Sequence, residues 1–298
     1  MKKIIFMMLS IVVATIFCTS CSSDSDDFQT SDTGQNVKGD ELVTLSFSPY
    51  TMESMTRGSG DATGISSITT ISRLDVFIIN GDDVITVNRD KATDGNTFGS
   101  NISVTLNKTK TYTIYAIAHK HSAPVTLENN IVTLPDDATT DCLFYSGTLT
   151  PATTTTVNCQ MQRVVGMFYF WMIDDLLDGV TKFKFTVSGA NTKLNVATGA
   201  STNAATWTKT FASLSKADDG YYKFKVFVMS TDAESTIQVD INVQAFDADD
   251  NVVKERLFEN VNIKNGYRTT YTGPFFTDAD MSISFTAVDW YELETVDF

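Results

Sequence analysis

Apolar and polar residues alternate along most of the chain beyond residue 40, a pattern typical of half-buried β-strands. In the segment 236–246, the apolar positions run from Ile237 to Ala245 at every second residue. A shorter segment at 42–48 places Val43, Leu45 and Phe47 on one face and polar side chains on the other. Helical periodicity is not sustained over any comparable length. The pattern therefore predicts a protein made of strands.

Short polar breaks separate the other segments with this character. The sequence Asn80-Gly81 lies between two of them and predicts a β-hairpin. The segment 163–172 is almost continuously apolar, which predicts a strand covered on both faces. Further strands are predicted at 73–79, 84–88, 102–106, 111–118, 143–149, 156–161, 182–187, 221–228, 252–258 and 282–287. We predict an all-β fold with two tandem antiparallel β-sandwich domains, 41–160 and 161–298.

The first residues have a different pattern. Lys2 and Lys3 precede an apolar run at 4–17, which small residues close just before Cys21. This arrangement predicts a secretory signal at 1–20, because the run is shorter than the ~20 residues of a transmembrane helix. Cys21 resembles the lipidated cysteine of a bacterial lipobox; ordinary secretion with an unmodified Cys21 is the alternative. The polar residues 21–40 predict a flexible tether, and the chain is expected outside the cytoplasm.

The charge of the chain narrows the choice of partners. The formal net charge is −14 and the isoelectric point is about 4.5. Nucleic-acid binders need a basic face, so a nucleic-acid partner is not expected. Attraction of the protein surface to anionic lipid is disfavoured for the same reason. We interpret the acidity as a solvated surface that carries no information about a ligand.

Cysteine and histidine are the scarce reactive residues. Once the signal is removed and Cys21 is acylated, Cys142 and Cys159 remain, and either a disulfide between them or two buried free thiols fits the sequence. His119 and His121 form an H-x-H pair at a predicted strand end, where exposed polar residues are the expectation and a metal site is the alternative.

Other signs of chemistry are weak. The acidic clusters at 247–250 and 278–280 fit ordinary turns better than calcium sites. Nucleotide-binding, zinc-protease and serine-hydrolase motifs are missing, so we predict neither an enzyme nor a cofactor or metal requirement. Most aromatic rings are expected in the core, with a sugar-stacking platform as the alternative for Tyr169, Phe170, Trp171, Tyr221, Tyr222, Trp290 and Tyr291.

Several segments in order resemble the fimbrillin superfamily of Bacteroides-type bacteria, which comprises type V pilus subunits and their anchor lipoproteins. They are Cys21 with its Ser/Asp run, the Thr56-Arg57-Gly58 sequence after the first strand, and the segments 72–84, 110–122, 144–176 and 260–276. Together they cover most of residues 40–290. The resemblance implies two transthyretin-like sandwiches, lipoprotein export to the outer membrane and cell surface, and assembly into a fimbrium.

In stalk and tip subunits of this superfamily, a protease cuts after an arginine and the first strand leaves. Arg57 matches that position, although Gly58 stands where alanine is common; an ordinary loop arginine is the alternative. Burial of Val43, Leu45 and Phe47 would contribute about 5–9 kcal/mol, against a net domain stability of about 5–15 kcal/mol. A strand from another pilus subunit would then refill the cleft. An uncut subunit would keep its lipid and serve as an anchor.

Two functional hypotheses remain. The first is a pilus subunit that serves adhesion to a host or bacterial surface receptor, with residues 281–298 as a candidate donor strand or as the last strand of their own domain. The second is a surface glycan-binding lipoprotein of a nutrient-uptake system, which predicts exposed rings such as Trp207 or Trp290. The first predicts that these rings are buried and that the first strand is detachable.

Overall fold

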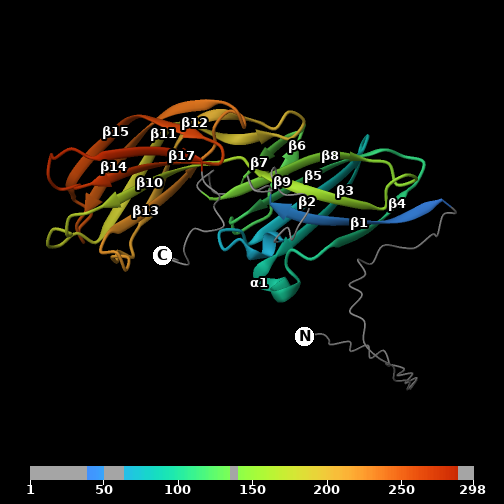
Figure 1. The fold of residues 1–298 in the computed structure, drawn as a ribbon, viewed down its shortest axis with the longest axis horizontal. Coiled ribbons are helices and arrows are strands. Elements are labelled where there is room, and N and C mark those ends of the chain that lie inside the picture. The colour runs from blue at the N-terminus through green and yellow to red at the C-terminus, as the bar shows by residue number, and fades with distance from the viewer. Residues whose placement is uncertain (1–38, 50–63, 135–139, 288–298) are drawn as a thin grey trace, which may run out of the picture. The chain divides into compact units, whose positions relative to one another are not determined.

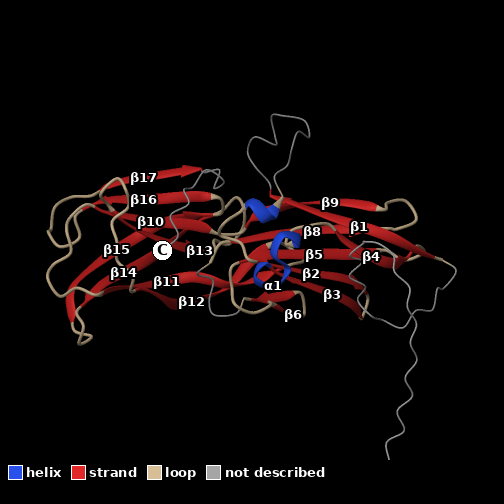
Figure 2. Cartoon of the chain, turned by 90° about the horizontal axis from the view of Figure 1, so that it is seen from below, coloured by secondary structure: helices blue, strands red, loops and turns tan. Residues whose placement is uncertain are grey.

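The computed structural model describes residues 39–49, 64–134 and 140–287. These residues form strands β1 to β17 and three short helical segments (Figures 1 and 2). The helical segments are η2 (Ile65–Ser67), α1 (Lys91–Asp94) and η3 (Gly95–Thr97). Within the described ranges, no helix has the length and apolar character needed to cross a bilayer. The predicted all-β fold is confirmed.

Three sheets hold the strands. The first sheet has the order β3-β2-β5-β8-β9-β1-β4, the second β13-β10-β16-β17, and the third β15-β14-β11-β7-β6, with β12 paired to β11. The bounds in the first sheet are β1 (Asp40–Pro49), β2 (Arg73–Asn80), β3 (Asp83–Asp90), β4 (Ile102–Asn107), β5 (Tyr112–His119), β8 (Cys142–Leu149) and β9 (Thr156–Arg163). Those in the second are β10 (Gly166–Met172), β13 (Tyr222–Val228), β16 (Tyr267–Gly273) and β17 (Ser282–Ala287). The third contains β6 (Thr126–Glu128), β7 (Ile131–Thr133), β11 (Lys182–Asn195), β12 (Ala200–Phe211), β14 (Thr236–Phe246) and β15 (Val252–Lys264).

The first core lies inside the seven-stranded sheet. Strands β8 and β9 pair at only two positions, Leu143↔Arg163 and Phe144↔Gln162, so the sheet divides there into two arms. The inward side chains of β2, β5 and β8 form one buried cluster with those of β9, β1 and β4. The two arms therefore face each other across this cluster, as the two layers of a β-sandwich do.

The second core fills the space between the four-stranded and six-stranded sheets. Phe168 and Phe170 of β10 are buried there with Phe183 and Phe185 of β11. The ring of Phe183 also meets that of Phe275, with centroids 5.2 Å apart in an edge-to-face arrangement. This second layered unit uses the inner faces of both sheets.

A third core joins the outer faces of the two layered units. Met167 and Tyr169 of β10 are buried in it together with Phe77 of β2, Ile117 of β5 and Leu194 of β11. Strand β10 thus buries one face in the second core and the opposite face in the third. The prediction that 163–172 contains a strand covered on both faces is confirmed.

A β-bulge in β11 keeps the buried side chains of this long strand on one face. Its register shifts between Ser188 and Ala190, and Gly189 adopts a φ of +86°. The extra residue shifts the alternation by one position, so Ala190 after the bulge lies in the second core with Phe183 and Phe185 before it. Leu194, further along the strand, lies in the third core.

The hairpin predicted at Asn80-Gly81 is present. Strands β2 and β3 pair from Arg73↔Asp90 to Asn80↔Asp83, which leaves Gly81 and Asp82 as the turn. Gly81 has a φ of +60° at the first turn position, where glycine is favoured because other residues are strained there. The division into two domains near residue 160 stays a prediction. The β6–β7 hairpin, which precedes that residue, pairs with β11 of the later half.

Candidate functional site

The first strand, β1, lies between two other strands rather than at the edge of its sheet. It pairs antiparallel with β4 from Asp40↔Asn107 to Leu45↔Ile102, and parallel with β9 from Thr44↔Thr156 to Pro49↔Met161. The two ladders overlap only at Thr44 and Leu45. Its first half therefore holds β4, and its second half holds β9.

The inward side chains of β1 are fully enclosed. Val43 and Leu45 have no exposed surface and Phe47 is 4% exposed. All three belong to the first core, where they lie with Ile102 of β4 and Met161 of β9. The alternation predicted for this segment is confirmed.

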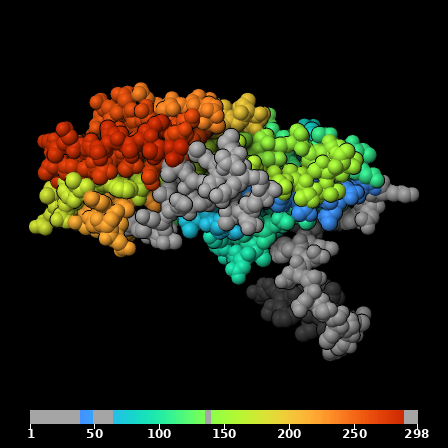
Figure 3. Space-filling model, in the orientation of Figure 1, coloured from blue at the N-terminus to red at the C-terminus, as the bar shows by residue number. Residues whose placement is uncertain are grey.

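The outward side of β1 contributes to the molecular surface beside β9 (blue and yellow-green in Figure 3). The Ser46 hydroxyl donates to the side-chain oxygen of Asn158 at 2.6 Å. The backbone N–H of Thr44 donates to the Thr155 carbonyl at 2.8 Å. These polar contacts position the strand, whereas the buried apolar side chains supply most of the free energy that holds it.

The residues proposed for processing and lipidation, Arg57, Gly58 and Cys21, lie outside the described residues. The last described strand, β17, pairs antiparallel with β16 at the edge of the four-stranded sheet. Its side chains Ile283 and Phe285 remain 62% and 40% exposed. Residues 282–287 are thus the last described strand of their own sheet, the second of the two roles considered for the C-terminal segment.

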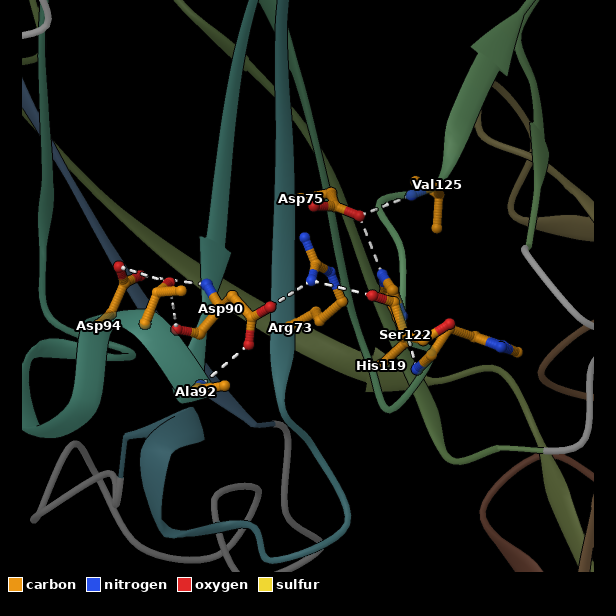
Figure 4. Close-up of polar contacts among 10 residues, drawn as sticks. Arg73, Asp75, Asp90, Ala92, Asp94, His119, Ser122 and Val125 are labelled. Carbon is orange, nitrogen blue, oxygen red and sulfur yellow. Dashed lines mark hydrogen bonds and ion pairs between the residues drawn. The ribbon is translucent and has the colours of Figure 1, made fainter.

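The histidine pair is buried, so the expectation of exposed strand-end residues is wrong. His119 donates from Nε2 to Asp75 Oδ2 at 2.9 Å, and its Nδ1 accepts the His121 backbone N–H at 3.1 Å (Figure 4). Asp75 Oδ2 also accepts the Val125 N–H at 2.8 Å. Because both ring nitrogens of His119 are engaged, the group anchors the loop after β5 and offers no lone pair to a metal.

Asp75 is a buried residue that the sequence reasoning missed. It lies within the apolar run of β2 and has no exposed surface. A carboxylate inside a strand that is apolar on both faces has to be buried and paired. The position of Asp75 within an apolar run therefore indicates its burial from the sequence alone. Next to it, Arg73 forms an ion pair with Asp90, whose other oxygen accepts the Ala92 N–H at 2.9 Å and caps α1 (Figure 4).

The acidic clusters are used within the protein. Asp247 Oδ1 accepts the backbone N–H groups of Asp249 and Asn251, both at 2.9 Å. These bonds, together with that from the Asn251 side chain, hold the pKa of Asp247 below its usual value. Asp278 pairs with Lys254 at 2.9 Å. Among the described residues, no three His, Cys, Asp or Glu side chains gather closely enough to hold a metal ion.

Cys142 and Cys159 are free thiols, so the disulfide is not formed. Cys142 lies in the third core and Cys159 in the first, so their side chains face different interiors. Burial raises the pKa of Cys159 to about 12, and burial with the nearby Asp141 carboxylate raises that of Cys142 as well. Both thiols remain protonated at neutral pH, which makes them inert packing groups.

The aromatic side chains are mostly internal. Trp207 is 4% exposed in the second core, and Tyr169 and Phe170 are buried. Trp171 stacks on Tyr221 with centroids 6.1 Å apart, and the Lys223 ammonium lies 4.7 Å from the Trp171 ring centre. Trp290 and Tyr291 lie outside the described residues. The expectation that most of these rings lie in the core is met by Tyr169 and Phe170, whereas Trp171, Tyr221 and Tyr222 are partly exposed.

Comparison with known proteins adds a family assignment. A family of unknown function, DUF6562, matches residues 105–292, which is more than half of the chain. The chain belongs to this family. The match begins within β4 and continues past β17, so it covers all of the second core and the residues of the third core except those on β2, such as Phe77. No curated protein sequence matches the chain.

Comparison with solved structures finds distant proteins of similar structure. A structure from Bacteroides thetaiotaomicron, described as candidate polysaccharide binding proteins of DUF1812, has a TM-score of 0.52 at 8% identity and covers 84% of this chain and 98% of its own. A candidate cell adhesion protein from Bacteroides uniformis has a TM-score of 0.49 at 16% identity, with coverages of 85% and 99%. A candidate adhesin from Bacteroides ovatus has a TM-score of 0.49 at 13% identity, with coverages of 82% and 94%. Because the sequence identity to the DUF1812 structure is only 8%, its similarity to this chain shows a shared fold and nothing more.

Proposed function

We propose that the chain is an adhesive surface protein, exported as a lipoprotein through Cys21, which assembles into a pilus by exchange of β1. The observation that carries the proposal is the position of β1, which pairs with β4 on one side and β9 on the other and completes the first core. Its removal would leave a gap one strand wide between β9 and β4. Neighbouring strands lie about 4.7–4.9 Å apart, so a single extended segment would fill this gap.

The shape of the gap specifies the incoming strand. Such a strand would run parallel to β9 and antiparallel to β4, because β1 does so. It would need three bulky apolar residues at alternate positions to replace Val43, Leu45 and Phe47. A strand from another copy of this chain or from a related pilus subunit would meet both requirements. Adhesion to a host or bacterial receptor would then be a property of the polymer.

The test is digestion with an arginine-specific protease, followed by mass measurement and denaturing gels. We expect one early cut after Arg57 and then a ladder of multimers. The matched control is Arg57→Lys, which keeps the positive charge and removes the cleavage site. Early cuts elsewhere with no multimers would contradict exchange of β1. A cut at Arg57 after which the chain stays monomeric would contradict self-assembly.

The glycan-binding alternative named Trp207 or Trp290 as an exposed ring; Trp207 is buried, and Trp290 lies outside the described residues. The candidate polysaccharide binding proteins of DUF1812 share the fold, but their low identity transfers no ligand to this chain. A different feature, a groove beside β9, favours recognition of sugars. It does not depend on an exposed tryptophan and is compatible with pilus assembly.

A further inference from the structure

A groove of about 760 Å³ lies where β8 and β9 separate. The two strands pair only at Leu143↔Arg163 and Phe144↔Gln162, after which β8 continues beside β5 and β9 beside β1. The groove therefore has a wall made of a strand that is fixed in a sheet. Its volume is in the range of sites that hold small organic ligands.

One wall is a row of carboxamides on β9. Side chains of a strand alternate, so Cys159 and Met161 enter the first core while Asn158, Gln160 and Gln162 face the groove. Neighbouring carboxamides in this row are about 6.8 Å apart, because each lies two residues further along a strand that rises about 3.4 Å per residue. Each carboxamide both donates and accepts hydrogen bonds. The row thus presents mixed donors and acceptors along its length.

Two aromatic residues of β8 also line the groove from opposite faces of the strand, Phe144 from the third core and Tyr145 from beside the first. Phe144 stacks on Tyr115 with centroids 6.4 Å apart and an interplanar angle of 24°. Tyr145 lies above Gly147, where a β-carbon would come within 2.2 Å of its hydroxyl oxygen. Glycine at 147 therefore leaves the space that the Tyr145 side chain occupies. Burial raises the pKa of Tyr145, so its hydroxyl remains a hydrogen-bond donor.

The opposite wall consists of three turns that bond to one another. They are residues 196–199 between β11 and β12, residues 232–234 between β13 and β14, and Asn265 between β15 and β16. The Ser201 N–H donates to the Thr231 carbonyl at 2.6 Å, and the Ser230 N–H donates to Asn265 Oδ1 at 3.3 Å. The wall is therefore preorganised, which lowers the entropic cost of binding.

The charges in the groove disfavour an anionic ligand. Arg163 uses Nε and Nη2 to bind both oxygens of buried Asp141, at 2.6 and 2.5 Å, so its charge is already compensated. Asp232 caps its own turn, and hydrogen bonds from Ser235 and Glu234 hold its pKa below the usual value. Asp232 and Glu234 thus bring two carboxylates to the groove, and the Lys264 ammonium, which is not among the lining residues, lies 3.7 Å from the Glu234 carboxylate. A phosphate or sulfate group would find carboxylates there without a free cation among the lining residues.

From these features we propose that the groove between β9 and the three turns binds a neutral oligosaccharide. Sugar hydroxyls donate and accept hydrogen bonds, as the carboxamides do, and a sugar face can pack against an aromatic ring among the lining residues. An extended peptide is the competing ligand, but it would need apolar pockets for alternate side chains. The groove instead presents polar groups along both walls. This proposal is independent of strand exchange.

The experiment measures binding of the intact secreted chain to an immobilised panel of mannose-, galactose- and glucose-based oligosaccharides. Sialylated and sulfated counterparts and extended Ser/Thr peptides complete the panel. We expect binding to at least one neutral oligosaccharide and weaker binding to its acidic counterpart. The double variant Gln160→Ala/Gln162→Ala should bind that oligosaccharide at least about tenfold more weakly, through loss of hydrogen bonds.

The matched control is Gln238→Ala/Gln244→Ala, which removes two glutamines from the outward face of β14 and should bind as the unaltered chain does. Glu234→Ala tests the opposite wall independently and should also weaken binding. Absence of binding to every neutral oligosaccharide would overturn the proposal. The proposal would also be overturned if the two double variants bound the oligosaccharide equally well, or if the chain bound the peptides instead of the oligosaccharides. Groove variants should still form multimers, so failure of assembly would count against the pilus proposal alone.

Discussion

Removal of β1 is the perturbation that tests the structure most directly. In the chain that begins at Gly58, the first core loses two fully buried side chains and one that is 4% exposed. Their burial contributes about 5–9 kcal/mol. The hydrogen bonds to β4 and β9 contribute about 0.5–1.5 kcal/mol each. Since a domain has a net stability of about 5–15 kcal/mol, we expect the first core to lose its cooperative structure.

Strand β4 should be affected more than any other. In the described part of the chain it pairs with β1 alone, so it loses its whole ladder when β1 is absent. Hydrogen exchange should show loss of protection at 102–107 before the strands of the second core. Binding of a hydrophobic dye should rise, because Ile102 and Leu106 become accessible.

Complementation then decides whether β1 acts as a separable strand. A peptide of residues 40–49, added to the chain that begins at Gly58, should restore protection at 102–107 and lower dye binding. The control peptide carries Leu45→Asp, which would bury an unpaired carboxylate at a position with no exposed surface. The reasoning would be refuted if the chain that begins at Gly58 had the same unfolding midpoint and bound the same amount of dye as the full chain. Equal rescue by both peptides would refute it too.

Three further predictions concern single positions. Gly147→Ala should destabilise the protein by about 1–3 kcal/mol in urea unfolding, because the new β-carbon displaces the Tyr145 hydroxyl; an unchanged midpoint would contradict this packing. Iodoacetamide at pH 8 should label Cys142 and Cys159 only after unfolding, as mass spectrometry would show, and rapid labelling of the native protein would contradict their burial. Burial and the nearby Lys120 charge lower the pKa of Lys209 from 10.5 to about 8. Between pH 8 and pH 10.5 the unfolded chain therefore binds more protons than the folded one, so the free energy of unfolding should rise with pH in this range. Lys209→Met should remove that rise and stabilise the protein at pH 7 by roughly 1–3 kcal/mol, whereas an unchanged pH profile of the melting temperature would show that Lys209 does not cause it.

Alternation predicted strands well where one face of the strand meets a core. In β1 and β14 the apolar residues at every second position are the ones that the structure buries. In β10 the continuous apolar run marked a strand with two buried faces. These predictions succeed because burial imposes the pattern directly on each strand.

Strands without a strong apolar pattern were not predicted. β12 is rich in Thr and Ala, pairs only with β11 among the described strands, and buries little apart from Ser201 and Trp207. The β6–β7 hairpin has three residues in each strand, too few to show a period. β16 has the sequence YRTTYTG, and its buried side chains, Thr269 and Thr270, are polar.

The candidate sites also differ in whether they depend on a local sequence pattern or on long-range pairing. The buried residues of β1 are fixed by local alternation, and the sequence identified them. The groove depends on where β8 and β9 part and on three turns that are distant in sequence, so no local pattern marks it. The burial of His119 likewise depends on Asp75, which is 44 residues away. Long-range pairing of this kind is invisible to a reading of neighbouring residues.

The separation of the three cores bears on how strand exchange would proceed. All the buried side chains of β1 lie in the first core and none in the other two. The third core uses the opposite faces of β2, β5 and β8, and these strands pair with one another without β1. Loss of β1 would therefore open the first core while the arm β3-β2-β5-β8 stays attached to the second layered unit. An incoming strand would meet one half of its cleft already formed, which favours insertion over aggregation of the opened subunit.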